Sequence, residues 1–244
     1  QVEAFKAKYG MDKPLWQQYL VWLGNAARLD FGRPFTAPEL SVTQMIGKVL
    51  PYSALVGGLA ALLAVTVGII LGMIAAARQN SLLDNIITGY SVFIATIPSF
   101  VMAYILAYVF AARLRLLPAG GWGDARHLIL PVVAYALPAT GGVARWTRQC
   151  LAEAMSADYV RTAYAKGLRQ SSVMSRHVLR NALIPMVTSF LPLFPGMMTG
   201  SIFIEFVFGL PGLGTYFVMS STNRDYPLVL GITAGFAVNL SGLP

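Results

Sequence analysis

Few side chains in this sequence could do chemistry. Its two histidines, His127 and His177, lie far apart in the chain, and its single cysteine, Cys150, has no second cysteine for a disulfide or a thiolate metal site. In the membrane topology derived below, the two histidines also fall on opposite sides of the membrane, so they cannot share a metal ion or a catalytic triad. We therefore predict no catalytic residue, no metal-binding residue and no enzymatic activity in this chain.

Motifs for nucleotide binding are also missing. The stretch "GLPGLG" (209–214) is rich in glycine, but it does not match G-x-G-x-x-G, and we interpret it as a tight extracellular turn. A G-x-x-x-x-G-K-[ST] P-loop occurs nowhere in the sequence. We expect this chain to bind no cofactor itself, so any energy source must lie on another protein.

A basic stretch, "DYVRTAYAKGLRQSSVMSRHVLRNALIP" (158–185), is the most unusual feature of the chain. Between residues 145 and 180, seven basic side chains face two acidic ones, a net charge of +5 out of +8 for the whole chain. Such a cluster could bind nucleic acid or anionic lipid, but regularly spaced apolar residues interrupt it. The basic residues are Arg145, Arg148, Arg161, Lys166, Arg169, Arg176 and Arg180.

Two short helices are predicted within and before this stretch. Good helix formers fill residues 151–167, and a glycine at the end is typical of a helix C-terminus. A second helix is expected to begin with Ser171 or Ser172 as its N-cap and to reach Asn181, before Pro185. The two helices would meet at a glycine turn and form a compact knob that fits a cleft on a partner.

The rest of the chain has the composition of a membrane protein. Hydrophobic residues make up 56% and charged residues 11%, and the mean hydropathy is +0.62. A helix needs about 20 apolar residues to cross the bilayer, and the uncharged runs show no alternation of the kind that marks barrel strands. We predict an all-α integral membrane protein with five spans. The spans are expected at about 51–77, 85–112, 128–144, 181–204 and 226–244.

The basic loop fixes the orientation, because short loops rich in Lys and Arg face the cytoplasm. Residues 145–181 are then cytoplasmic, and residues 1–50 form an extracytoplasmic segment. Within that segment, 14–32 is expected to contain an amphipathic helix that lies at the membrane interface or packs on the bundle, two alternatives that the sequence leaves equal. An outside N-terminus is awkward for a chain start, although long polar segments do cross regardless of charge, and a sixth span that precedes these residues in the intact protein would remove the difficulty.

The spans contain many helix breakers and few ionisable groups. Prolines and glycines are frequent, and repeated breaks fit a bundle that lines a cavity. The small-residue patterns "GIILG" (68–72) and "GMMTG" (196–200) permit close helix contact. Glu205, at the outer end of the fourth span, is the only charged side chain expected to reach into the spans. Proton- and ion-coupled carriers usually need charged groups at mid-membrane. This counts against a self-powered pump, although a stand-alone secondary carrier or channel remains the alternative.

The basic stretch resembles the EAA loop of ABC-importer permeases, in the version found in the oligopeptide/dipeptide branch. "DYVRTAYAKGL" and "RHVLRNALIP" carry the likeness, with Arg161, Thr162 and Ala163 where the family has Glu-Ala-Ala and Gly167 as the motif's glycine. The first two positions depart from that triplet. "IPSFV", "LPAGGW", "GLPGLGTYFV" and "NRDYPLVLG" also resemble this family, in the same order, so the likeness covers roughly residues 30–232.

The resemblance implies a subunit of a larger transporter in the bacterial cytoplasmic membrane. Its partners would be a second, similar permease, two cytoplasmic ATPase subunits that bind ATP and Mg, an extracytoplasmic substrate-binding protein and membrane lipid, with no nucleic acid. The cargo would be peptides, with peptide-like antibiotics, glutathione and nickel chelates as alternatives. Residues expected to couple to the ATPase are Arg161, Thr162, Ala163, Tyr164, Lys166, Gly167, Leu168, Arg169, Arg176 and His177. Residues expected along the translocation path are Pro98, Ser99, Pro192, Pro195, Gly196 and Gly200.

Overall fold

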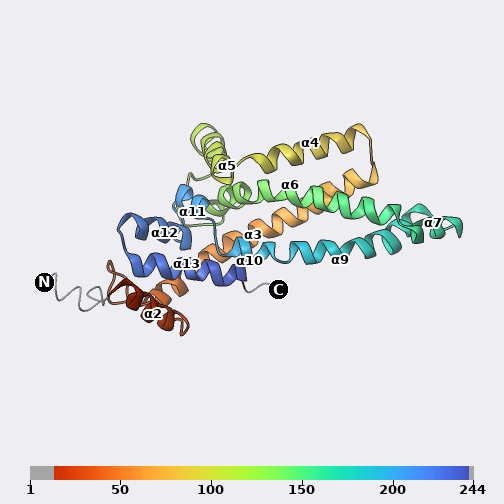
Figure 1. Cartoon of the computed structure of the whole chain (residues 1–244). Coiled ribbons are helices and arrows are strands. Elements are labelled where there is room, and N and C mark those ends of the chain that lie inside the picture. Colours follow the sequence, from red (N-terminus) through yellow and green to blue (C-terminus); the bar gives the residue numbers. More distant parts are fainter. Residues whose placement is uncertain (1–13, 242–244) are drawn as a thin grey trace.

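The hydrophobic runs of the sequence all fold into helices. The computed structural model describes residues 14–241, and every regular element in that range is helical. Figure 1 shows the longest helices lying side by side along one axis, with α7 at one end and α2 near the other. The elements are α2 (Leu15–Ala26), α3 (Val42–Ala77), α4 (Leu82–Thr96), α5 (Ser99–Leu106), η1 (Ala107–Arg113), α6 (Arg126–Ser156), α7 (Asp158–Ala165), α8 (Gln170–Val173), η2 (Met174–Val178), α9 (Leu179–Phe190), α10 (Leu193–Met198), α11 (Ile202–Phe208), α12 (Leu213–Thr222) and α13 (Tyr226–Ser241).

Three helices are long and apolar enough to cross a membrane unbroken. They are Val42–Ala77, Arg126–Ser156 and Arg176–Met198. Two bent pairs pass the same test when each pair is taken together: Leu82–Thr96 with Ser99–Arg113, and Ile202–Phe208 with Leu213–Thr222. The described part of the chain therefore holds between three and five spans, which agrees with a polytopic helical membrane protein.

The first long helix, α3, begins nine residues before the expected span. Ser41 accepts a hydrogen bond from the backbone N–H of Gln44, and the Gln44 side chain accepts one from the Ser41 N–H, which together form a capping box. Pro51 lies inside the helix without ending it. At 1.5 Å per residue, 36 residues extend about 54 Å, so α3 is longer than the hydrocarbon core is thick.

Close packing of α3 against α6 forms the centre of the molecule. A Cβ added to Gly68 would lie 2.6 Å from the Val143 side chain, and one added to Gly72 would lie 2.5 Å from Thr147. The "GIILG" pattern thus permits the close contact expected of it. Although α6 contains Pro131 and Pro138, it continues through both of them to Ser156.

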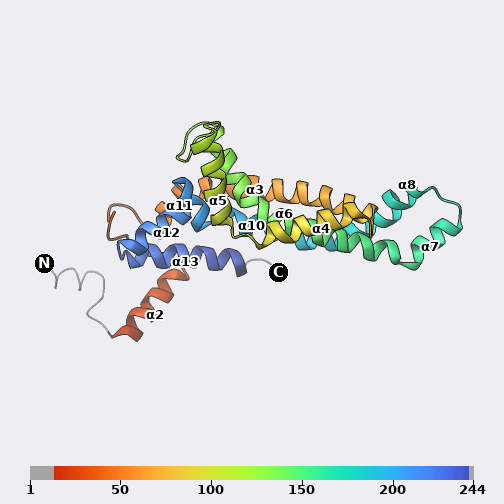
Figure 2. The same ribbon diagram turned by 90° about the horizontal axis from the view of Figure 1, so that it is seen from above.

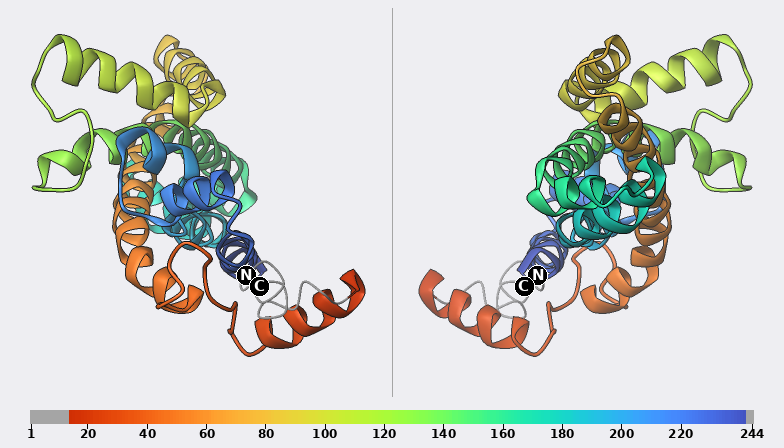
Figure 3. Two further views of the ribbon diagram at one scale, coloured as in Figure 1. Left: turned by 90° about the vertical axis from the view of Figure 1, so that its left-hand side faces the viewer. Right: turned by 90° about the vertical axis from the view of Figure 1, so that its right-hand side faces the viewer.

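The expected span over 85–112 is divided by a sharp bend. Ile97 adopts an extended backbone immediately before Pro98, as residues that precede proline tend to do. The helices on either side meet at 97°. Consequently α5 and η1 leave the bundle and project sideways from it (Figure 3).

The expected span over 181–204 has different limits in the structure. The helical segment begins at Arg176, before the expected span, continues through Pro185 and ends at Met198. Gly200 then takes a left-handed backbone conformation (φ +92°). The residues that follow Gly200 form α11 and α12, which meet at 86° across the GLPGLG turn, so the end of the expected span and the expected turn together form a helical hairpin. We call α11, this turn and α12 the α11–α12 hairpin.

Candidate functional site

The basic stretch folds into two helices joined at a glycine, as predicted. Gly167 has φ +76°, its N–H donates to the Tyr164 carbonyl, and the Leu168 N–H donates to the Ala163 carbonyl. This hydrogen-bond pattern is the Schellman motif that ends many helices at a left-handed glycine. We call α7, this turn and α8 the elbow; Figure 2 shows that it forms one tip of the molecule.

Two details of the elbow differ from expectation. The helix over 151–167 is interrupted at Ala157, where the backbone is extended; just before it, the Ser156 hydroxyl donates to the Glu153 carbonyl, a bond of the kind that competes with helix hydrogen bonds. The second helix begins at Gln170, slightly ahead of the expected serine cap, and the Arg169 carbonyl accepts the first hydrogen bonds of its turn.

The elbow presents a polar outer face on an apolar base. Val160, Ala163, Val173 and Val178 are buried in one hydrophobic cluster with residues of α3, α6 and α9. Tyr164 and Leu168 remain about half exposed, at 48% and 42%. Of the residues expected at the partner contact, Ala163 therefore packs inward. Exposed members of that set are Arg161, Thr162, Tyr164, Lys166, Gly167, Leu168, Arg169 and Arg176, and His177 is partly exposed.

A π-helical turn, η2, follows the elbow and carries Arg176 and His177. Such turns inside α-helices are uncommon and occur often at functional sites. The Asn181 side chain donates to the His177 carbonyl at 2.7 Å. This turn connects the elbow directly to α9, so a displacement of the elbow would reach the third long helix.

A partly buried ion pair that the sequence did not reveal lies near the elbow end. Arg148 on α6 donates two hydrogen bonds to Asp84, at 2.5 and 2.6 Å. The Asp84 side chain is 1% exposed and also accepts from the Asn80 N–H at 2.9 Å. The two residues are 64 positions apart, so only the folded arrangement of α4 beside α6 brings them together.

The residues expected along the path fall in two separate places. Pro98 is exposed at the bend that begins α5, and α5 packs against α6 and α11, where the Phe100 and Phe203 rings lie 5.5 Å apart. The other group lies on α10 or next to its two ends, and α10 packs chiefly on α3; Met197 of α10 is buried against Gly57. The second group consists of Pro192, Pro195, Gly196 and Gly200.

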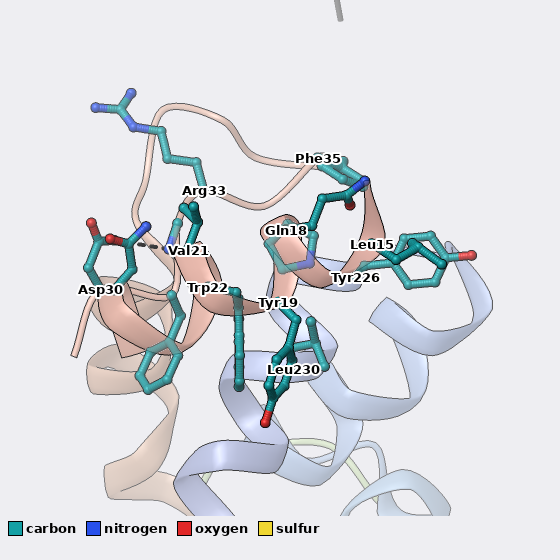
Figure 4. Close-up of a pocket in the computed structure, with 14 residues that line it drawn as sticks. Leu15, Gln18, Tyr19, Val21, Trp22, Asp30, Arg33, Phe35, Tyr226 and Leu230 are labelled. Carbon is teal, nitrogen blue, oxygen red and sulfur yellow. Dashed lines mark hydrogen bonds between the residues drawn. The ribbon is translucent and has the colours of Figure 1, made fainter. Parts of the chain in front are cut away.

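A pocket of about 460 Å³ opens at the end opposite the elbow, between α2, residues 30–35 and the start of α13. Figure 4 shows Trp22 and Tyr19 pointing from α2 toward Leu230 of α13. Trp22 also packs on the cluster around Phe31, while Leu15 is 83% exposed. The amphipathic helix therefore makes contact with the bundle through one side and leaves much of its apolar surface open.

Beside this pocket, a buried carboxylate holds two distant segments of the chain together. Asp225, which is 0% exposed, accepts hydrogen bonds from the Thr36 N–H at 2.9 Å and the Thr36 hydroxyl at 2.7 Å. The pair holds the segment that precedes α3 against the start of α13. Among residues 14–241, no group of three His, Cys, Asp or Glu side chains is placed to hold a metal ion.

This arrangement of long apolar helices, bent spans and a helical elbow defines a polytopic membrane transport component. A model of the family described as "binding-protein-dependent transport system inner membrane component" matches residues 68–243. The chain belongs to this family. It is accordingly a multi-pass protein of the bacterial cytoplasmic membrane, and a transport subunit rather than an enzyme.

Similar proteins include peptide transport permeases. The chain is 43% identical over 230 residues to the oligopeptide transport system permease protein OppB of Haemophilus influenzae, an alignment that covers 93% of this chain and 75% of that protein. It is 38% identical over 240 residues to the dipeptide transport system permease protein DppB of Lactococcus lactis, covering 98% and 79%. The resemblance to oligopeptide and dipeptide permeases expected from the EAA loop is confirmed.

Solved structures support the fold. A crystal structure of an amino acid ABC transporter with histidines matches with a TM-score of 0.63 at 20% identity, over 82% of this chain and 90% of that one. The MetNI methionine ABC transporter in an inward-facing form matches with a TM-score of 0.51 at 13% identity, over 82% and 93%. At these identities the likeness concerns the fold alone.

Proposed function

We propose that this chain is the transmembrane permease subunit of an ATP-driven importer of peptides. The single observation that carries the proposal is the elbow, a helical knob with a polar outer face, in a chain whose relatives are named as oligopeptide and dipeptide permeases. Because the sequence contains no P-loop, ATP and Mg would be bound by two separate ATPase subunits.

The elbow is proposed to be the lever between those ATPases and the spans. Its exposed residues, from Arg161 to Arg169, would contact the ATPase, with Arg176 and His177 beside them. Ala163 would contribute by packing the lever on the bundle, because its side chain is buried. Rigidity supports this role, since the apolar base joins the elbow to α3, α6 and α9 in one cluster.

The opposite end of the bundle is proposed to face outward and to receive a substrate-binding protein. The pocket beside α2, the loop over 117–126 and the α11–α12 hairpin all lie toward that end and would form the docking surface. The translocation path would run between this chain and a second, similar permease. Pro98 and Ser99 at the α5 bend, and 192–200 around α10, are the proposed lining or gate.

Substitutions at Gly167 test directly whether the elbow acts as a lever. An added Cβ there meets no heavy atom within 4 Å among the described residues, but the positive φ strains any side chain. We expect Gly167→Val in the assembled transporter to lower uptake about tenfold or more while ATP hydrolysis and membrane insertion persist, because the strained turn displaces the elbow. Uptake into proteoliposomes and phosphate release measure the two activities.

Gly167→Asn is the matched control, because asparagine tolerates the left-handed conformation better than a β-branched residue. It should retain most of the uptake. Normal uptake by Gly167→Val would remove the elbow from the mechanism. A stand-alone carrier or channel is the competing function, and uptake by the purified chain in liposomes without ATPase subunits would favour it.

A further inference from the structure

Glu205 is a deeply buried acid that the proposed mechanism leaves unused. It lies on α11, its side chain is 1% exposed, and Oε2 accepts a hydrogen bond from the Gly214 N–H at 2.6 Å. Oε1 is buried without a hydrogen-bond partner among the described residues. Burying a carboxyl group costs free energy unless it is hydrogen-bonded or paired, so a buried acid in a membrane protein is a candidate functional residue.

Glycines surround this carboxylate and create its space. A Cβ added to Gly200 would meet Oε1, and one added to Gly212 would meet Oε2, both well inside contact distance. A Cβ on Gly214 would lie 2.5 Å from Ile202 at the start of α11. Gly212 and Gly214 of the GLPGLG turn and Gly200 of the "GMMTG" pattern therefore leave room for the Glu205 side chain, beyond simply allowing the chain to turn.

Glu205 supplies a hydrogen-bond acceptor at the N-terminus of α12, which has no capping side chain of its own. The N-cap of α12 is Gly212, which has no side chain to accept hydrogen bonds from the first N–H groups of the helix. Two residues outside α12 accept them instead: Ser53 Oγ accepts from Leu213 at 2.8 Å, and Glu205 Oε2 accepts from Gly214.

Ser53 belongs to α3, so the two acceptors join three helices at one point. Ser53 is 1% exposed and lies two positions after Pro51. Glu205 contributes from α11, and the donors belong to α12. We call Ser53, Glu205, Leu213 and Gly214 the clasp.

We propose that Glu205 is a positioning residue for transport: with Ser53 it caps α12 and holds the α11–α12 hairpin on α3, so that hairpin and helix move together. This rests on the proposed importer function and adds to it a named residue at the end opposite the elbow. The required property is a hydrogen-bond acceptor at the Oε2 position; neither the charge nor a proton on Glu205 takes part.

The test compares Glu205→Gln with Glu205→Leu in the assembled transporter. Gln keeps an oxygen for Gly214, so its uptake should stay within about twofold of wild type. Leu has a similar volume and no acceptor, so uptake should fall about tenfold, the effect of leaving one buried N–H unpaired. ATP hydrolysis should persist in both variants. Thr233→Ala, at an exposed position of α13 where the hydroxyl donates only to the Val229 carbonyl of its own helix, is the control and should be unchanged.

A covalent substitute for the clasp separates positioning from a folding defect. A Cβ at position 212 points at Ser53 Oγ, 2.6 Å away, so Ser53→Cys with Gly212→Cys is in range of a disulfide. We would place this pair in a Glu205→Ala, Cys150→Ala background, where the clash with the carboxylate is gone. Oxidation should restore uptake to at least half of wild type, and reduction should abolish the rescue.

Several results would overturn the proposal. Normal uptake by Glu205→Leu would show that the clasp is dispensable, and a Gln variant as defective as Leu would show that the charge is what matters. A cross-linked protein that inserts normally but stays inactive would show that the hairpin must move relative to α3. The importer function itself fails on a different result, namely wild-type complex whose uptake does not depend on ATP.

Discussion

At the scale of single residues, contacts made by buried acidic side chains specify how distant helices lie relative to one another. Asp84 and Arg148 form a two-point ion pair between α4 and α6, near the end of α6 that leads into the elbow. The geometry is that of a guanidinium fork on a carboxylate, in which direction as well as charge is specified. We infer that this pair fixes the angle between the two helices near the elbow.

Removing the arginine should therefore be costly. In Arg148→Gln, Asp84 loses its counter-charge and keeps the Asn80 N–H, and we expect the transporter to lose about 1–2 kcal/mol of stability, less than for a fully buried pair because Arg148 is 30% exposed. A lower apparent melting temperature in detergent would measure this. Arg145→Gln, at an exposed position on the same helix, is the control. Equal melting temperatures for the two variants would show that the pair contributes nothing.

At the scale of the elements, helix packing explains why α6 stays unbroken through two prolines. Small residues on both partners allow α3 and α6 to approach closely along much of their length, with Gly68 facing Val143 and Gly72 facing Thr147. Proline normally bends a helix, but here the packing on α3 continues on both sides of Pro138. The bend at Pro98, by contrast, occurs where the helix leaves the bundle.

A test of this packing is Gly72→Ala. The new methyl group would lie 2.6 Å from the Ala144 carbonyl oxygen as well as close to Thr147, so the helices must separate, at a cost of about 1–3 kcal/mol. Thermal stability in detergent and resistance to protease should both fall. Gly47→Ala on the same helix meets no atom within 4 Å in the described part of the chain and should be neutral or slightly stabilising. If both variants behave alike, close packing is not the reason for Gly72.

At the scale of the whole molecule, the structure is polarised along the bundle axis. One end carries the basic elbow, and the other carries α2, the pocket and the α11–α12 hairpin (Figures 1 and 2). Positive residues in short loops favour the cytoplasmic side. A single orientation would therefore place the elbow beneath the membrane and the pocket above it.

Cysteine labelling tests this orientation. Asp124→Cys and Asp158→Cys, each made in a Cys150→Ala background, replace side chains that are 65% and 98% exposed. A membrane-impermeant maleimide should label position 124 in right-side-out vesicles or spheroplasts, and position 158 only in inverted vesicles. The opposite pattern would contradict the topology and the assignment of the elbow as an ATPase contact. Added ATPase subunits should protect position 158.

Much of this architecture follows from local sequence. Long uncharged runs predict spanning helices because every backbone polar group must be paired within the membrane. Gly167 marks the elbow because a left-handed residue is needed there to end α7. These features depend on neighbours close in the chain, and the structure agrees with the helices and with the turn. The expected span over 226–244 is an exception, because its described residues form only a shorter apolar helix, Tyr226–Ser241. The limits of the spans were less predictable, since hydropathy averages over a window and records no change of direction.

What the sequence by itself determined is the class of protein: an all-helical membrane permease with a helical elbow. Only the tertiary structure decided which distant residues meet. Asp84 pairs with Arg148, and Asp225 accepts hydrogen bonds from Thr36. Glu205 and Ser53 accept hydrogen bonds from the first N–H groups of α12, whose own N-cap is a glycine. A single buried polar residue leaves no pattern in the neighbouring sequence, because the packing of the helices determines which distant residue it contacts. For this reason, the turn that appears from its glycines to be a simple loop becomes, once folded, the centre of the clasp.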